Sequence, residues 1–273
     1  MAAVTVAGGV PAGRPHLLRQ AGALSWRAVV RLARQPQAGV PATVFPLLLV
    51  AVNSSAMSRV TSIPGVVPPG TTFLMFLLPA AIVQGVMFGA INGGAELATD
   101  IQTGFFDRLV SSPVSRPAIL VGRLGGAMAF GALQAVFFQV VLWPFGADVE
   151  GGLAGRLVLV VVAVLLSLGL GAVAAGLSAR TGQAEAVQGF FPLVFILLFL
   201  SSAFFPTQLM SGWYKAVADH NPLTWMIDGM REQVLVGFSA SAAATSIGVC
   251  LAICAVGLLF AVSQVQRRLR VAS

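Results

Sequence analysis

The distribution of charged residues constrains the fold of this chain more than any other feature of its sequence. Charges divide the 273 residues into long uncharged intervals, which are residues 35–58, 60–95, 124–147, 157–179, 186–214 and 233–266. Each interval reaches the roughly 20 residues that a helix needs to cross the hydrocarbon core of a bilayer. With 57% hydrophobic and only 9% charged residues, the chain is too apolar for a soluble protein of this length. We therefore predict an integral membrane protein.

Six membrane-spanning helices follow from the six intervals, because a backbone inside a bilayer must satisfy its own hydrogen bonds and a helix does so within one segment. Proline and glycine separate loops from spans, which we place near residues 39–57, 72–94, 124–145, 157–178, 188–205 and 243–264. The predicted fold class is thus an all-α integral membrane protein. Its expected parts are an N-terminal segment, a six-span domain and a basic tail, with the boundaries 1–37, 38–266 and 267–273.

Basic residues predict the orientation of the spans. If both termini are cytoplasmic, the inner segments contain twelve arginines, whereas the outer segments contain three arginines and the single lysine. By the positive-inside rule, this bias predicts a multi-pass protein of the cell membrane with both termini in the cytoplasm. The arginines lie at predicted membrane edges rather than in a soluble basic domain. We therefore expect membrane lipids, and no nucleic acid, as their partners.

The residues before the first span have an amphipathic pattern. Leucine and valine side chains gather on one side of a helix drawn over residues 16–35, and arginines project from the other side. With Trp26 as an anchor and Pro36 at its end, this pattern predicts a helix lying in the cytoplasmic interface of the membrane. An irregular basic tail is the alternative interpretation.

A charged segment, Glu96–Arg123, separates the second and third predicted spans. Gly104 interrupts it and Pro113 stops it, so we expect a short cytoplasmic helix parallel to the membrane, then a turn and the entry to the third span. Thr99 or Asp100 is expected to cap the short helix.

Two interpretations of this segment remain open from its residues alone. In the first it is a peg for a groove of a partner protein, with apolar anchors and orienting charges. The anchors are then Phe105, Phe106 and Leu109, and the charges are Asp107, Arg108 and Arg116. In the second interpretation it is a solvated loop whose charges only mark the cytoplasmic side.

The region after the fifth span is too polar to span the membrane and too apolar for a free loop. We expect two short helices at the outer face, about residues 209–219 and 223–235, separated by Asn221 and Pro222. Trp213, Tyr214 and Trp225 would then lie at the level of the lipid headgroups. Interfacial and re-entrant placements both fit this pattern.

Several kinds of chemistry are disfavoured by what the spans and loops contain. The predicted spans hold no ionisable residue, which argues against a proton- or sodium-coupled transporter. A phosphate-binding P-loop needs a lysine in a glycine-rich context, and Lys215 follows Trp-Tyr on the outer side. His16 and His220 lie on opposite sides of the membrane, so they cannot share a metal. We therefore expect no catalytic residue, no metal and no bound cofactor in this chain.

Polar and aromatic residues within the spans allow two interpretations. Amides and hydroxyls in membrane helices usually bond to neighbouring helices, and phenylalanines usually face lipid or core. The alternative is that some of them line a path for a substrate, with the candidates Gln84, Asn92, Gln134, Phe138, Phe191 and Phe195. In the fourth span Gly169, Gly171 and Gly176 predict close approach of neighbouring helices.

Two runs of the sequence resemble motifs of the type-2 ABC exporter permeases. In that family an acidic residue near the end of the second span precedes a glycine, a second acidic residue and a Pro-x-(Ser/Pro)-Arg stretch. The first run matches at Asp100, Gly104, Asp107, Arg108, Leu109, Pro113, Ser115, Arg116, Leu120, Gly122 and Arg123. The second run looks like the signature of the family's outer face, at Pro206, Trp213, Asn221, Pro222, Thr224, Asp228 and Arg231. Ser211-Gly212 departs from a frequent Pro-Gly or Pro-x pair.

With the six spans, this resemblance covers the chain from about residue 14 onward, and it is most like the daunorubicin/doxorubicin-resistance branch. It implies the permease subunit of an ATP-driven exporter, without enzymatic activity of its own. A separate ABC ATP-binding subunit, in two copies, would bind ATP and Mg, and a second permease subunit, identical or homologous, would complete the complex. The implied cargo is a hydrophobic or amphipathic compound, drug-like or lipid-like.

The resemblance also implies which residues couple the chain to its ATP-binding subunit. These are Glu96, Asp100, Gly104, Phe105, Phe106, Asp107, Arg108, Leu109, Pro113 and Arg116. Arg180 and Glu185, in the second cytoplasmic loop, would form a smaller contact or simply mark the inner side. Two other functions remain: a polysaccharide or teichoic-acid exporter permease, and, from a different class, a membrane scaffold or sensor without transport activity.

Overall fold

A computed structural model of the protein describes residues 36–63, 68–105 and 116–271. Every regular element within these ranges is a helix. In chain order the elements are α2 (Pro36–Ala56), η1 (Ser58–Ser62), α3 (Phe73–Gln102), α5 (Arg116–Leu142), η2 (Trp143–Phe145), α6 (Gly152–Thr181), α7 (Ala184–Gln188), α8 (Phe190–Phe199), η3 (Thr207–Leu209), α9 (Gly212–His220), α10 (Pro222–Leu235) and α11 (Ala240–Val271). The predicted interfacial helix over residues 16–35 lies outside the described residues.

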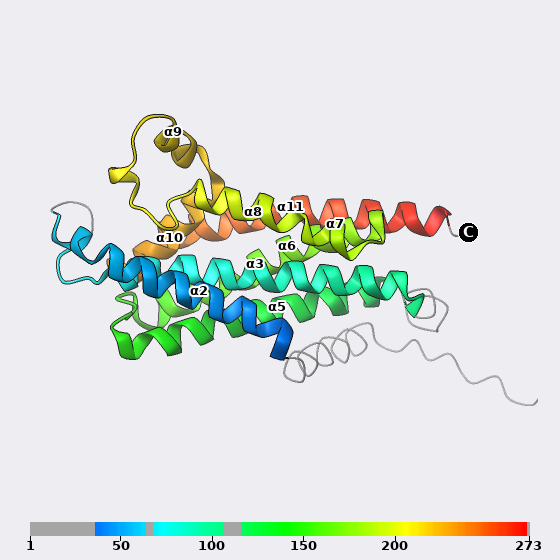
Figure 1. The fold of residues 1–273 in the computed structure, drawn as a ribbon, viewed down its shortest axis with the longest axis horizontal. Coiled ribbons are helices and arrows are strands. Elements are labelled where there is room, and N and C mark those ends of the chain that lie inside the picture. Colours follow the sequence, from blue (N-terminus) through cyan, green and yellow to red (C-terminus); the bar gives the residue numbers. More distant parts are fainter. Residues whose placement is uncertain (1–35, 64–67, 106–115, 272–273) are drawn as a thin grey trace, which may run out of the picture.

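The long helices lie side by side in one bundle with two distinct ends (Figure 1). At the end that carries the C-terminus, which we call the C-terminal end, Nη1 of Arg268 donates to the carbonyl of Ala179, 3.2 Å away, and so joins α11 to α6. At the opposite end, which we call the α9 end, Oγ1 of Thr72 donates to the carbonyl of Gly146 over 3.3 Å. Successive long helices therefore connect alternate ends of the bundle.

Four helical stretches are long and apolar enough to cross a membrane: Phe73–Gln102, Gly122–Phe145, Gly152–Thr181 and Ala240–Arg268. They correspond to the second, third, fourth and sixth predicted spans. Two shorter apolar helical stretches, Val40–Ala56 and Ala184–Phe199, correspond to the first and fifth. The chain is thus an all-α, multi-pass membrane protein.

The helices of the fifth apolar stretch do not fill the predicted span, residues 188–205, and begin before it. Helix α7 begins earlier, at Ala184, and α8 ends at Phe199, after which residues 200–205 form turns and bends. The hydroxyl of Ser201 donates to the carbonyl of Leu198, 2.5 Å away. Such short-range bonds from serine compete with helical hydrogen bonds, which favours the end of the helix at this point. The apolar run in the sequence therefore predicted that this segment is helical but did not predict where its helix ends.

Helix α3 is the centre of the bundle, with every residue from Phe73 to Met87 buried. It packs against α2, α5, α6, α7 and α10. Glycines bring its neighbours close: the side chain of Phe138 lies against Gly85, and the hydroxyl of Ser178 donates to the carbonyl of Gly94 over 2.7 Å. Most of α3 therefore contacts protein rather than lipid.

Small residues set the spacing between α6 and its neighbours, as the sequence predicts. A methyl group at Gly169 would lie 2.9 Å from Cγ2 of Ile253, and one at Gly176 would lie 2.5 Å from the Phe260 ring. At Gly171 a methyl group would lie 3.2 Å from Cβ of Ala127 on α5. The prediction of close helix approach is confirmed for all three glycines, because a larger side chain has no room there.

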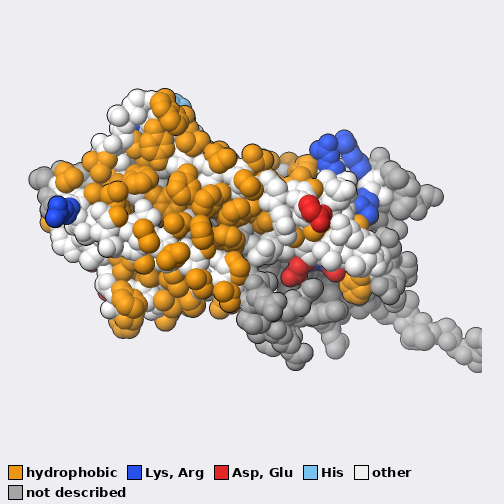
Figure 2. All heavy atoms as spheres, viewed as in Figure 1, with side chains coloured by type: hydrophobic (Ala, Val, Ile, Leu, Met, Phe, Trp, Pro, Cys, Tyr) orange, Lys and Arg blue, Asp and Glu red, His pale blue; other side chains and the backbone are white. Residues whose placement is uncertain are grey.

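Apolar and charged side chains occupy different parts of the surface, as they occupy different parts of the sequence. Figure 2 shows one face on which hydrophobic side chains cover the broad part of the molecule, while acidic and basic side chains gather near the C-terminal end. Large apolar side chains such as Leu157, Leu193 and Leu259 are more than half exposed. An apolar girdle of this kind suits contact with lipid or with another membrane subunit.

Candidate functional site

The C-terminal end of the bundle holds the charged residues that flank the segment between α3 and α5. Helix α3 continues through Glu96 and Asp100 as far as Gln102. The carboxylate of Asp100 forms an ion pair with the guanidinium of Arg123 on α5, and these two side chains are 18% and 25% exposed. The ion pair therefore links the helix that enters the segment to the helix that leaves it.

The expectation that Thr99 or Asp100 caps a new short helix is wrong. Both lie inside α3, where Oγ1 of Thr99 donates to the carbonyl of Ala95 over 3.1 Å. The cap that ends α3 is Thr103, followed by Gly104 with a positive φ of 67°. No glycine or proline occurs between Ala95 and Thr103, so nothing stops the helix before the left-handed turn at Gly104.

The residues predicted to contact a partner are only partly described. Gly104 and Phe105 are half-buried, and Arg116 is the first residue of α5. The other predicted contacts, Phe106, Asp107, Arg108, Leu109 and Pro113, lie outside the described residues. The interpretation of this segment as a peg for a partner therefore stays a prediction.

The second predicted contact lies at the same end of the bundle. Arg180, in the last turn of α6, and Glu185, in the first turn of α7, are both exposed. Between them Gly182 has a positive φ of 66°, and a methyl group on it would lie 3.5 Å from Cγ2 of Ile101 in α3. The loop between α6 and α7 therefore lies beside the end of α3, from which the charged segment continues.

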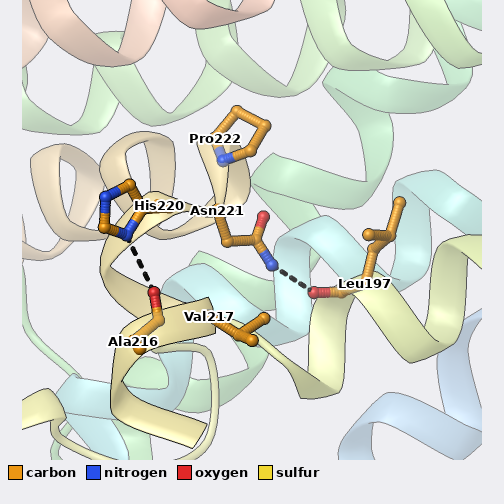
Figure 3. A pocket seen from close by; sticks show the side chains of 6 residues that line it. All are labelled: Leu197, Ala216, Val217, His220, Asn221 and Pro222. Atoms are coloured by element: carbon orange, nitrogen blue, oxygen red, sulfur yellow. Dashed lines mark hydrogen bonds between the residues drawn. The ribbon is translucent and has the colours of Figure 1, made fainter. Parts of the chain in front are cut away.

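At the α9 end, Asn221 joins three helices. Its side-chain amide nitrogen donates to the carbonyls of Leu197 and Leu200, at 2.7 and 3.1 Å, and so satisfies the end of α8. Its side-chain oxygen accepts from the backbone nitrogen of Leu223 at 2.9 Å and caps α10. Pro222 occupies the first turn of α10, where its missing N–H leaves no bond unmade. Figure 3 shows Asn221 reaching from the start of α10 toward α8.

The rest of the outer-face motif bonds to the irregular backbone after α8. Oγ1 of Thr224 accepts from the backbone nitrogen of Ser202 at 3.2 Å, and Asp228 accepts from the Ser202 hydroxyl at 2.6 Å. Nη2 of Arg231 donates to the carbonyl of Ser202 over 2.7 Å. Non-helical backbone at membrane depth requires such internal partners. The motif is therefore a socket for residues 200–203.

Arg231 is the buried centre of this socket. Its Nε donates to the carbonyl of Phe76 over 3.3 Å, its guanidinium lies 3.6 Å from the centre of the Phe76 ring, and Nη1 donates to Asp228 over 2.5 Å. Burial lowers the pKa of Arg231 to about 10, while Asp228 acts in the opposite direction. Since that value is well above 7, the guanidinium stays charged and joins α10 to the start of α3.

Sequence reasoning placed Asn221, Pro222, Asp228 and Arg231 at the outer face but missed Ser202, the common partner of Asp228 and Arg231. Thr224, which also bonds to it, stood in the motif without an assigned role. Two short helices, α9 and α10, occur close to the predicted residues, while their place at the outer face stays a prediction. Pro206 precedes η3, and Trp213 is 72% exposed, consistent with its predicted place at the headgroups.

An open pocket of about 470 Å³ lies where α9 and α10 meet α8. Leu197, Ala216, Val217, His220, Asn221 and Pro222 line it (Figure 3). Nδ1 of His220 lies 2.9 Å from the carbonyl of Ala216 on its own helix. No serine, threonine, cysteine or carboxylate side chain lines the pocket, and the described residues contain no cluster of three potential metal ligands. The pocket is a mostly apolar recess.

The predicted substrate-path residues separate into two groups. Gln84 and Phe138 are buried within the bundle, and Nε2 of Gln134 donates to Oγ1 of Thr43 over 3.3 Å. Asn92, on the last turns of α3, is half-buried. In contrast, Phe191 and Phe195 belong to a row of partly exposed rings over α2, α3 and α8, made of Phe45, Phe88, Phe191, Phe195 and Phe199.

Comparisons with known proteins identify the family of this chain and several relatives. The family model described as ABC-2 type transporter matches residues 19–235. The daunorubicin resistance ABC transporter permease protein DrrB1 of Streptomyces coeruleorubidus is 29% identical over 211 residues, which cover 76% of this chain and 72% of DrrB1. The inner membrane transport permease YadH of Escherichia coli strain K12 is 27% identical over 212 residues, which cover 72% of this chain and 77% of YadH.

A third relative, the putative transport permease ycf38 of Porphyra purpurea, is 24% identical over 218 residues, which cover 79% of this chain and 74% of the relative. The match to the family model includes both the charged segment between α3 and α5 and the outer-face socket. The chain belongs to the ABC-2 type transporter family.

Proposed function

We propose that this chain is the permease subunit of an ATP-driven exporter of a hydrophobic or amphipathic compound, drug-like or lipid-like. The observation that carries the proposal is the charged segment between α3 and α5, closed at its base by the Asp100–Arg123 ion pair, in a member of the ABC-2 type transporter family. The naming of the relative DrrB1 for daunorubicin resistance supports a drug-like cargo. The apolar girdle and the row of partly exposed phenylalanine rings suit a cargo that enters from the lipid phase.

All six apolar stretches span the membrane in this proposal. The 21 residues of α2 give a length of about 32 Å at 1.5 Å per residue, enough for a hydrocarbon core of about 30 Å. The fifth span is shorter, and residues 200–203 complete it as buried irregular backbone held by the socket on α10. The C-terminal end faces the cytoplasm of the cell, where its arginines follow the positive-inside rule, and both termini lie there.

The ATP-binding subunit docks at the C-terminal end, in two copies that bind ATP and Mg. It receives the charged segment, with Phe105, Phe106 and Leu109 as apolar anchors and Asp107, Arg108 and Arg116 as orienting charges. Arg180 and Glu185 form a second contact, which the position of their loop beside the end of α3 supports. A second permease subunit, identical or homologous, completes the complex.

The test is purification of the chain in mild detergent together with the ATP-binding subunit that accompanies it, followed by reconstitution into vesicles. We expect an equal amount of an ATPase, with activity that daunorubicin stimulates. Replacement of Asp107 by Asn or Arg116 by Gln should reduce that stimulation, whereas Lys215→Gln at the α9 end, matched in losing one charge, should not. Recovery of the chain without any ATPase would instead favour a scaffold or sensor.

A further inference from the structure

The Asp100–Arg123 ion pair joins α3 and α5 at positions inside the two helices rather than at their ends. Asp100 precedes the end of α3 at Gln102, and Arg123 lies about two turns into α5, which begins at Arg116. The residues that connect the two helices therefore all fall between Asp100 and Arg123 in the sequence. The pair closes the base of this loop.

Partial burial makes this contact firmer than an ion pair in open solvent. The side chains of Asp100 and Arg123 are 18% and 25% exposed, whereas the pair of Asp148 and Arg156 at the α9 end is 59% and 34% exposed. Water and salt screen a partly buried pair less, and a charge-assisted hydrogen bond adds directional preference. The ion pair at the C-terminal end can therefore hold two helices in register.

Both helices already rest on α6 at this end. Leu97 and Ile101 of α3 pack with Ala175, and Leu124 of α5 packs with Ala172. These contacts are apolar and have little directional preference, so they permit sliding of one helix past another. Beside them, the ion pair is a direct polar link between α3 and α5.

We propose that Asp100 and Arg123 are a positioning pair for coupling: they hold the two ends of the charged segment together, so that a force on the segment moves α3 and α5 as one body. In this role Asp100 acts on Arg123 within the chain rather than as a contact to the ATP-binding subunit. The inference rests on the proposed function, since it concerns how force from that subunit enters the bundle.

The test uses the complex of the full chain with its co-purified ATP-binding subunit in vesicles, with daunorubicin as the transported probe. Asp100→Asn and Arg123→Gln should each leave assembly with the subunit intact while daunorubicin transport per ATP hydrolysed falls by about fivefold or more. The double variant D100R/R123D, which reverses the pair, should restore that ratio. The matched control, Asp148→Asn, removes the acidic partner of the exposed Asp148–Arg156 pair and should leave daunorubicin transport per ATP hydrolysed unchanged.

The outcomes separate the two proposals. A direct contact of Asp100 with the ATP-binding subunit would keep the reversed double variant uncoupled, which would overturn the positioning role. Wild-type coupling in both single variants would overturn it as well. A wild-type complex that neither retains an ATPase nor transports the probe would instead refute the proposed function, and the positioning role with it.

Discussion

Replacement of Arg231 by Gln should destabilise the protein strongly, because Arg231 is the one cation to which α3, α10 and the backbone after α8 all bond within the described residues. Gln is shorter and neutral, so it cannot replace the fork of guanidinium donors. Two buried carbonyls, those of Phe76 and Ser202, would lose a charged donor, at about 1 to 3 kcal/mol each. Loss of the cation–π contact with the Phe76 ring adds about 1 kcal/mol.

The expected total is therefore about 3 to 7 kcal/mol, which corresponds to a fall in Tm of at least about 10 °C for a chain of this size. The two cysteines of the sequence, Cys250 and Cys254, are both buried, so a thiol-reactive dye reports unfolding without any introduced label. Lys215→Gln is the control, because Lys215 is 45% exposed and its ion pair with Asp219 lies at the surface. An equal Tm for both variants would refute the assignment of Arg231 as the centre of the socket.

Two further predictions concern the packing of α11 and the effect of pH. Gly257→Ala should lower Tm, because its methyl group would meet the carbonyl of Gly169 and overpacking costs about 1 to 3 kcal/mol. The control is Gly248→Ala on the same helix, whose methyl group meets open space. Equal Tm values for the two variants would contradict the close approach of α6 and α11. The stability difference between wild type and Arg231→Gln should stay constant between about pH 6 and pH 9 in the same dye assay, because Arg231 with a pKa of about 10 remains charged there. Its folded pKa is below the unfolded value, so above about pH 10 the folded state releases the proton first and stability rises. A difference that changed steadily from pH 6 to pH 9 would show that another group titrates with Arg231.

The sequence by itself determined the class of the protein, the number of apolar segments and the ends at which charges gather. Hydrophobicity and charge act locally, because each span must match the bilayer whatever its neighbours are. The same reasoning failed at helix ends: α3 continues to Gln102 rather than to residue 94, and α8 stops at Phe199 rather than at residue 205. Polar residues continue a helix beyond the bilayer as readily as apolar ones, so hydropathy does not mark where a helix ends.

Only the tertiary structure decided which residues act together. Asp100 and Arg123 stand 23 positions apart in the sequence, and the bond from Arg231 to the Phe76 carbonyl joins residues 155 positions apart. Both motifs were visible as patterns in the sequence. Their spacing did not reveal that Asp100 of the first motif pairs with Arg123, or that the second motif forms hydrogen bonds to the non-helical backbone after α8. That information is absent from local periodicity because it depends on how α3, α5 and α10 pack against each other.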